Sequence, residues 1–358
     1  MSLPPVIDTA AEVTPEWLSA ALNSAGLAVA VESVTTTPVG TGQMADSARL
    51  SISYSTEVKS APNTLVGKFP STDPQSRSAG EHGGYASEIG FYTHLAHTVS
   101  GNTPRCYYAE TGSPAEFTLL MQDMAPSVQG DQIAGCSVAQ AEAALVNLAR
   151  FHGPRWCDET LFEVPSLASR DESNATGSLL AEFMAAFTPE FVNRYSGRLS
   201  ADDIDLAIQF AARVSAWDQF DTGEFGLLHG DYRLDNLLFG TTAEHPAVTT
   251  VDWQTLKIGP PLRDTAYFLG TSLDAEIRAE HEQRLVRVYY DELARQGVSD
   301  YSFEQCWASY RLGSLQGPLI AILGSIGVKQ TERGDEMFMA MIRRSGEQVR
   351  HLDALSLF

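Results

Sequence analysis

The stretch that decides the fold runs over residues 227–239 and reads Leu227-Leu228-His229-Gly230-Asp231-Tyr232-Arg233-Leu234-Asp235-Asn236-Leu237-Leu238-Phe239. Two apolar runs, at 227–228 and 237–239, enclose a segment crowded with His, Asp, Arg and Asn. Apolar flanks of this kind predict strand ends that lead into a tight loop. The polar side chains are therefore expected at the rim of a core.

A further carboxylate follows at Asp252, directly after the β-branched residues 248–251, which predict a strand. Asp231, Asn236 and Asp252 have the order and spacing of the catalytic base and the metal ligands in protein kinases. Carboxylate and amide oxygens suit Mg²⁺, and Asp231 would accept or orient the proton of an attacking hydroxyl group. An isolated His-Gly-Asp could merely cap a turn, but the added spacing favours phosphoryl transfer.

The motif from His229 to Asn236, with Asp252-Trp253-Gln254 after it, resembles the aminoglycoside phosphotransferase and choline kinase superfamily. Together with residues 259–269 it looks most like the ecdysteroid kinase-like branch and its bacterial relatives. The resemblance implies ATP- and Mg²⁺-dependent phosphorylation of a hydroxyl group on a small molecule, with Asn236 and Asp252 as metal ligands.

The same resemblance implies a two-lobed, protein-kinase-like α+β fold. Residues 1–126 would form a small N-lobe of antiparallel strands with one helix, and residues 127–358 a larger, mainly helical C-lobe. Asp264 is expected to brace the catalytic loop. Arg233, two residues after Asp231, could either aid the transferring phosphate or pair with Asp235.

Apolar residues alternate with polar or β-branched ones at 27–39 and again at 49–55, which predicts two strands around a loop that contains Gly40 and Gly42. In a kinase this hairpin covers the ATP phosphates, because glycine lets backbone N–H groups approach them. On its own the pattern also fits an ordinary turn. The resemblance assigns Lys68, on the strand predicted at 64–69, to the α- and β-phosphates. It assigns Glu88, in the helix predicted at 85–99, to steadying that lysine.

The apolar strand predicted at 117–121 ends in a chain breaker at 122–126. A kinase-like fold has its adenine-binding hinge at this place. The candidates for the adenine pocket are Leu120, Met121, Gln122 and Met124, although Leu and Met are more often ordinary core residues.

The formal net charge of −21 argues against nucleic acid or an anionic membrane surface as the partner. The four cysteines include no Cys-x-x-Cys pair, so neither a zinc site nor a disulfide framework is indicated. The first residues have no basic start or long apolar run, and the most apolar stretch, 317–328, is too short to span a bilayer. We therefore expect a reduced, soluble, cytoplasmic protein.

A helix is predicted from residue 138 to near 152–154. Further helices are predicted at 179–195, 201–217, 264–269, 276–297, 303–313 and 331–355. In the superfamily the acceptor substrate lies against helices of the C-lobe. The stretch 314–328 contains no acid and is rich in Leu and Ile. An apolar lining of this kind favours a largely apolar alcohol, of the steroid, terpenoid or hydroxyacyl type. These residues could equally be ordinary core.

Three other functions are weighed against this one. An aminoglycoside O-phosphotransferase would need several carboxylates that converge beside Asp231. A non-catalytic nucleotide-binding module would lack at least one of Lys68, Asp231, Asn236 and Asp252, and all four are present. A metal-dependent hydrolase would collect several His or carboxylate ligands, whereas this stretch offers one His.

Overall fold

The computed structural model describes residues 3–40, 44–56, 58–167, 170–220 and 222–358. The chain forms two compact units. Unit 1 consists of Met1–His97, Thr103–Pro126 and Asp252–Thr255, and unit 2 consists of Thr98–Asn102, Ser127–Val251 and Leu256–Phe358.

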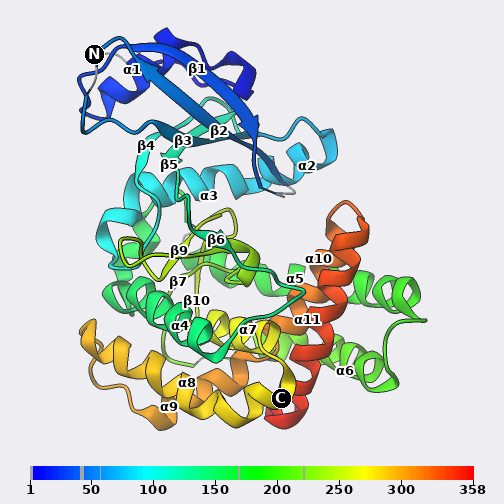
Figure 1. The fold of residues 1–358 in the computed structure, drawn as a ribbon. Helices are drawn as coiled ribbons and strands as arrows, with labels where there is room; N and C mark the ends of the chain where they lie inside the picture. Colours follow the sequence, from blue (N-terminus) through cyan, green and yellow to red (C-terminus); the bar gives the residue numbers. More distant parts are fainter. Residues whose placement is uncertain (1–2, 41–43, 57, 168–169, 221) are drawn as a thin grey trace. The chain divides into compact units, whose positions relative to one another are not determined.

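The centre of unit 1 is a five-stranded antiparallel sheet with the strand order β1-β2-β3-β5-β4 (Figure 1). Its strands are β1 (Val31–Pro38), β2 (Ala45–Tyr54), β3 (Thr64–Pro70), β4 (Cys106–Thr111) and β5 (Phe117–Gln122). Leu119 of β5 lies opposite Lys68 of β3 in the register. Because side chains alternate along a strand, Leu119 shares a face of the sheet with Lys68, and Phe69 and Leu120 lie on the other face.

Helix α1 (Pro15–Ser24) covers that second face of the sheet (Figure 1). Thr14 caps the helix by accepting a hydrogen bond from the N–H of Trp17, and Pro15 occupies its first turn. The apolar side of α1 packs with Phe69 and Leu120 in one buried cluster.

The helical run between β3 and β4 begins earlier than the sequence predicts. It consists of α2 (Pro74–Ala79), a π-helical turn (Gly80–Gly84), α3 (Tyr85–Gly90), a second π-helical turn (Phe91–Leu95) and a 3₁₀ turn (Ala96–Thr98). The glycine-rich segment before Tyr85 indicates a loop, because glycine lowers helix propensity. The carboxylate of Asp73 nevertheless caps the run, and the buried Tyr85 hydroxyl donates to the Met44 carbonyl at 2.6 Å. Capping and tertiary packing thus override the local preference.

Unit 2 is mainly helical, and its helices are α4 (Val138–His152), α5 (Arg170–Tyr195), α6 (Ala201–Asp218), α7 (Leu262–Ser272), α8 (Ala275–Arg295), α9 (Phe303–Gly313), α10 (Gln316–Gly327) and α11 (Glu332–His351). Helix α5 starts at Arg170 rather than near residue 179, because the polar residues before 179 carry no apolar periodicity to reveal it. The apolar stretch at 314–328, whose conformation the sequence leaves open, contains α10.

Two small antiparallel sheets carry the stretch 227–239 in unit 2. One joins β7 (Gly226–Leu228) to β10 (Lys257–Gly259), and the other has the order β6-β8-β9, with β6 (Val128–Gln129), β8 (Leu237–Phe239) and β9 (Val248–Thr250). The strands predicted on both sides of the polar segment are therefore present. Among the described residues, no helix is both long enough and apolar enough to cross a membrane.

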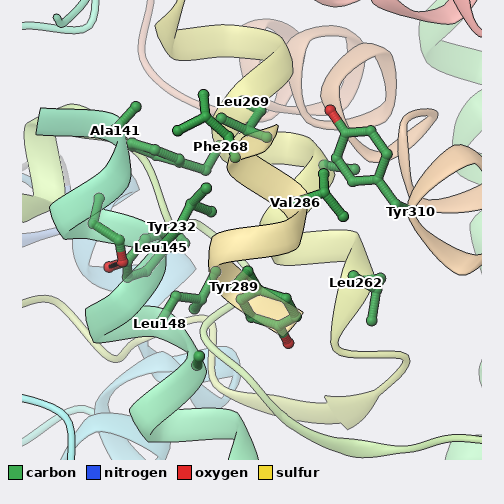
Figure 2. Packing of buried hydrophobic residues seen from close by; sticks show 14 of the residues in the cluster. Ala141, Leu145, Leu148, Tyr232, Leu262, Phe268, Leu269, Val286, Tyr289 and Tyr310 are labelled. Atoms are coloured by element: carbon green, nitrogen blue, oxygen red, sulfur yellow. Dashed lines mark hydrogen bonds between the residues drawn. The ribbon is translucent and has the colours of Figure 1, made fainter. Parts of the chain in front are cut away.

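Residues of α4, α7, α8 and α9 form one buried cluster together with residues of the stretch 227–239 (Figure 2). Tyr232, from the middle of that stretch, packs in this cluster with Leu145 and Phe268. Its hydroxyl donates to the Ala144 carbonyl of α4 at 2.7 Å. The polar loop is therefore anchored by a residue that points into the core.

Candidate functional site

Lys68, Glu88 and Asp252 form a three-membered charge cluster in unit 1. The Lys68 ammonium donates to Glu88 Oε2 at 2.6 Å and to Asp252 Oδ1 at 2.9 Å. The Glu88 side chain is fully buried, and that of Lys68 is 9% exposed. The structure thus brings together the lysine and the glutamate that the sequence analysis pairs.

The charges of this cluster depend on one another. Burial alone would lower the pKa of Lys68, but the carboxylates of Asp252 and Glu88 outweigh burial and raise it. Burial raises the pKa of Glu88, and the charge of Lys68 opposes that effect. Lys68 is therefore a permanent cation at neutral pH and stabilises the ionised form of its partner.

Asp252 has an unusual backbone conformation, with φ at 67°. A residue other than glycine in the left-handed region is uncommon, and such residues are frequent at functional sites. The next residue, Trp253, stacks on Phe91 with ring centroids 3.6 Å apart, and the backbone N–H of Trp253 donates to Glu88 Oε1 at 3.3 Å. These contacts hold the segment that carries the Asp252 carboxylate.

The glycine hairpin is described only in part. Gly40 follows β1 with φ at 78°, and an added Cβ atom there would meet nothing within 4 Å. Gly42 lies outside the described residues. Strand β2 starts at Ala45, inside the segment that the sequence analysis treats as loop, since residues 45–48 pair with β3.

The four hinge candidates differ in where their side chains lie. The side chain of Leu120 belongs to the core cluster under α1, on the face opposite Lys68, so the backbone of Leu120 is the part that remains a candidate for adenine binding. Met121 shares the face of Lys68, Gln122 is exposed at the strand end, and Met124 is buried. Asp123, which the sequence analysis does not single out, accepts two hydrogen bonds from Arg49 and one from the Ala125 N–H.

In unit 2, Asp264 holds the backbone of the loop that begins at His229. Its carboxylate accepts hydrogen bonds from the N–H groups of His229 at 2.6 Å and Gly230 at 3.0 Å. These are contacts of the bracing kind that the sequence analysis expects. His229 turns inward, with Nε2 3.1 Å from the Val251 carbonyl and Nδ1 accepting from the Asp231 N–H. Its ring therefore supports the loop.

The Asp231 carboxylate is fixed by three donors. Arg233 Nε and Asn236 Nδ2 each donate to Oδ2 at 2.9 Å, and the Tyr267 hydroxyl donates to Oδ1 at 2.8 Å. The side chain of Asp231 remains 22% exposed. Tyr267 was not predicted from the sequence. Its place three residues after Asp264, on the same side of one helix, is the signal that points to it.

Arg233 contacts both of its neighbouring carboxylates. Besides its bond to Asp231, Arg233 donates from Nη1 to Asp235 Oδ2 at 2.6 Å. Burial alone would lower the pKa of Arg233, but the charges of Asp231 and Asp235 outweigh burial and raise it. Arg333 and the buried Gln132 also bind Asp235, and neither was predicted from the sequence. The pairing of Arg233 with Asp235, one of the two alternatives, is thus present.

Asn236 uses its amide nitrogen within the loop. Nδ2 donates to the Asp231 carbonyl as well as to the Asp231 carboxylate, each at 2.9 Å. The amide oxygen is therefore the atom that Asn236 can offer to a cation. The Val251 N–H donates to the Asn236 carbonyl at 3.0 Å, and Asp252 is the next residue of the chain.

Comparisons with known proteins agree with this geometry. The model of the ecdysteroid kinase-like family matches residues 40–298. Among solved structures, the GDP complex of wild-type aminoglycoside 2'-phosphotransferase-IIIa has a TM-score of 0.53 at 16% identity, over 88% of this chain and 93% of its own. The GDP and kanamycin complex of APH(2")-IIia has a TM-score of 0.54 at 15% identity, over 88% of this chain and 94% of its own. None of the curated proteins compared with the chain matches it.

At such low identities the solved structures show the fold alone, and that fold is protein-kinase-like. The family match adds more, because it covers well over half of the 358 residues and includes Lys68, Asp231 and Asp252. The chain therefore belongs to the ecdysteroid kinase-like family.

Proposed function

We propose that this protein is an ATP- and Mg²⁺-dependent kinase that phosphorylates a hydroxyl group of a largely apolar small molecule. The observation that carries the proposal is the Asp231 carboxylate, which is partly exposed and fixed by three donors in a loop of kinase spacing. The buried Lys68–Glu88 pair of unit 1 supports it as the expected phosphate-binding group.

In the proposed reaction the acceptor oxygen forms a bond to the γ-phosphorus of ATP. The bond from that phosphorus to the β–γ bridging oxygen breaks, and ADP leaves with its electron pair. The proton of the hydroxyl group passes to the Asp231 carboxylate. Since such transfer depends mostly on positioning and charge neutralisation, Lys68 would bind the α- and β-phosphates and Glu88 would orient Lys68. Arg233, bound to two carboxylates, would position Asp231 rather than touch phosphate.

The residues assigned to Mg²⁺ have suitable donor atoms. Asp252 supplies a carboxylate whose side chain is 34% exposed, and Asn236 supplies an amide oxygen. Mg²⁺ is usually held by one or two protein oxygen ligands together with nucleotide phosphates and water. When bound, the ion would neutralise charge on the phosphates of ATP. Lys68 fixes one oxygen of Asp252, which orients that carboxylate.

The residues around Asp231 in unit 2 support the proposed class of acceptor. Tyr267 bonds to Asp231 and has its ring in a buried cluster with Leu319 of α10 and Met337 of α11. Ile320 and Leu323 of α10 and Phe187 of α5 are only partly buried against the same cluster. Some residues of the predicted acceptor stretch, such as Leu315 and Ile322, are ordinary core.

Helix α5 adds exposed apolar surface beside these residues. Leu179 and Phe183 are 47% and 44% exposed, and the ring of Phe183 lies 5.8 Å from that of Phe187. Removing hydrocarbon from water at such a surface yields about 25 cal/mol per Å² of buried area. This surface supports binding of an apolar alcohol of the steroid, terpenoid or hydroxyacyl type.

The charges beside Asp231 argue against a polycationic acceptor. Both oxygens of Asp235 accept hydrogen bonds from Arg333, and Oδ2 also accepts one from Arg233. Burial alone would raise the pKa of Asp235, but these arginines outweigh burial and lower it. Because guanidinium groups already neutralise this carboxylate, it offers little attraction to the ammonium groups of an aminoglycoside.

The test is ADP release from MgATP in the presence of androsterone, farnesol, 3-hydroxydecanoate or kanamycin, each compared with a reaction that lacks an acceptor. We expect ADP release to increase with one of the apolar alcohols and to fall roughly 10²–10⁴-fold in Asp231→Asn. Stimulation by kanamycin alone would favour the aminoglycoside kinase. ATP binding without any turnover would favour the non-catalytic module.

A further inference from the structure

The Tyr267 hydroxyl binds a different oxygen of Asp231 from the other two donors. Arg233 and Asn236 both donate to Oδ2, whereas Tyr267 donates to Oδ1. A carboxylate oxygen has room for about two hydrogen bonds. Among the contacts of the described residues, Oδ2 is therefore filled, and Oδ1 keeps one position beside that of Tyr267.

Tyr267 is held rigidly where it makes this contact. Its side chain is fully buried in the cluster that contains Leu319 and Met337, and its carbonyl accepts a hydrogen bond from Thr271 Oγ1 at 2.7 Å. Burial raises the pKa of Tyr267 well above its ordinary value, and the charge of Asp231 adds to that effect. The hydroxyl group therefore keeps its proton and acts as a donor.

Helix α7 fixes the catalytic loop through two residues on one side. Asp264 accepts hydrogen bonds from the loop backbone, and Tyr267, three residues later, donates to the Asp231 side chain. Residues three apart lie on the same side of a helix. One rigid helix thus sets both the position of the loop and the orientation of its carboxylate.

We propose that Tyr267 is a positioning residue for the transfer: it occupies one acceptor position of Asp231 Oδ1 and thereby directs the remaining position toward the acceptor hydroxyl group. This inference rests on the proposed function, since it requires Asp231 to receive the proton. Tyr267 acts through Asp231 and takes no proton itself.

The test is Tyr267→Phe, with Tyr310→Phe as the matched control. Tyr310 is also fully buried in unit 2 and also donates to a carboxylate, Glu282 Oε1, at 2.6 Å. Both variants lose one buried hydroxyl group, but only the first loses a bond to Asp231. The probe is whichever of androsterone, farnesol, 3-hydroxydecanoate and kanamycin gives the fastest ADP release with the wild type.

We expect Tyr267→Phe to lower kcat roughly 10-fold, a change of about 1.4 kcal/mol, and to leave KM for ATP within twofold. Tyr310→Phe should keep kcat within twofold, whatever its melting temperature. On an Asp231→Asn background, Tyr267→Phe should change the residual rate less than twofold, because the two residues act as one unit.

Each other outcome overturns the proposal in a distinct way. An unchanged kcat in Tyr267→Phe removes the positioning role and leaves the kinase function intact. An equal loss in Tyr310→Phe shows that packing, and not the bond to Asp231, is responsible. A full 10-fold loss on the Asp231→Asn background shows that Tyr267 acts independently. A wild type that releases no ADP with any acceptor refutes the kinase function, and this proposal with it.

Discussion

Replacing Lys68 with methionine should destabilise unit 1 more than replacing Glu88 with glutamine, although both changes break the same ion pair. Glu88→Gln leaves Lys68 with a second carboxylate, because Asp252 Oδ1 lies 2.9 Å from the ammonium group. Lys68→Met takes the cation away from a glutamate that is fully buried. The geometry therefore predicts an asymmetry between the two variants.

The size of the asymmetry follows from typical costs. Removing one partner of a buried ion pair costs about 3–5 kcal/mol, because a buried charge is left uncompensated. Losing one charge-assisted hydrogen bond while a second carboxylate remains costs about 1.5–3 kcal/mol. We therefore expect Lys68→Met to be less stable than Glu88→Gln by about 2 kcal/mol.

The difference in stability between Lys68→Met and Glu88→Gln should depend on pH. Burial raises the pKa of Glu88, and removing Lys68 raises it further, because Lys68 is the charge that opposes burial. A carboxyl group whose pKa is raised in the folded state contributes stability at low pH and loses it as pH rises through that folded value. The stability of Lys68→Met should therefore be closest to that of Glu88→Gln under mildly acidic conditions and furthest below it under mildly alkaline conditions.

Urea unfolding followed by tryptophan fluorescence measures the difference, since Trp253 stacks on Phe91 within unit 1. Lys59→Met, at an exposed lysine of the same unit, is the control and should stay close to the wild type. Equal stability of Lys68→Met and Glu88→Gln, or the reverse order, would refute the asymmetry.

Four more outcomes are expected. Asp231→Asn should keep ATP affinity in calorimetry but lower kcat roughly 10²–10⁴-fold, and near-normal turnover would remove Asp231 as the base. Asp252→Ala should lose Mg²⁺-dependent ATP binding, and an unchanged affinity would show that Asp252 is not a metal ligand. Lys68→Ala and Glu88→Ala should each raise KM for ATP, with a double variant far from additive, whereas additive effects would separate the pair. Phe183→Ser should raise KM for the apolar alcohol roughly 3–10-fold while KM for ATP stays constant, and an unchanged acceptor KM would place the alcohol elsewhere.

The contacts within the stretch 227–239 were predictable because its polar residues are close together in sequence. Asp231 and Asn236 are five residues apart, and the structure joins their side chains directly. Lys68 and Glu88 lie 20 residues apart, and only the resemblance to a known family paired them before the structure showed their contact.

Other contacts depend on packing that periodicity does not reveal. Tyr267 meets Asp231 across 36 residues, and α7 also holds the loop through the hydrogen bonds that Asp264 accepts from His229 and Gly230. Leu120 was assigned to the adenine pocket from its place before the chain breaker, and the register of β5 against β3, which puts its side chain on the core face, is invisible in the sequence. The helical run from Pro74 was missed because glycine propensity indicated a loop, whereas the Tyr85–Met44 contact overrides that preference.

The central claim is transfer of a phosphoryl group from ATP to an alcohol, with Asp231 as the proton acceptor. Its most direct test is phosphorus NMR of a reaction that contains MgATP and the apolar alcohol with the fastest ADP release, run with the wild type and with Asp231→Asn. We expect the wild type to convert the γ-phosphate signal into that of a phosphate monoester of the alcohol, and Asp231→Asn to leave ATP almost unchanged. Release of inorganic phosphate without any monoester, or equal monoester formation by both proteins, would contradict the claim.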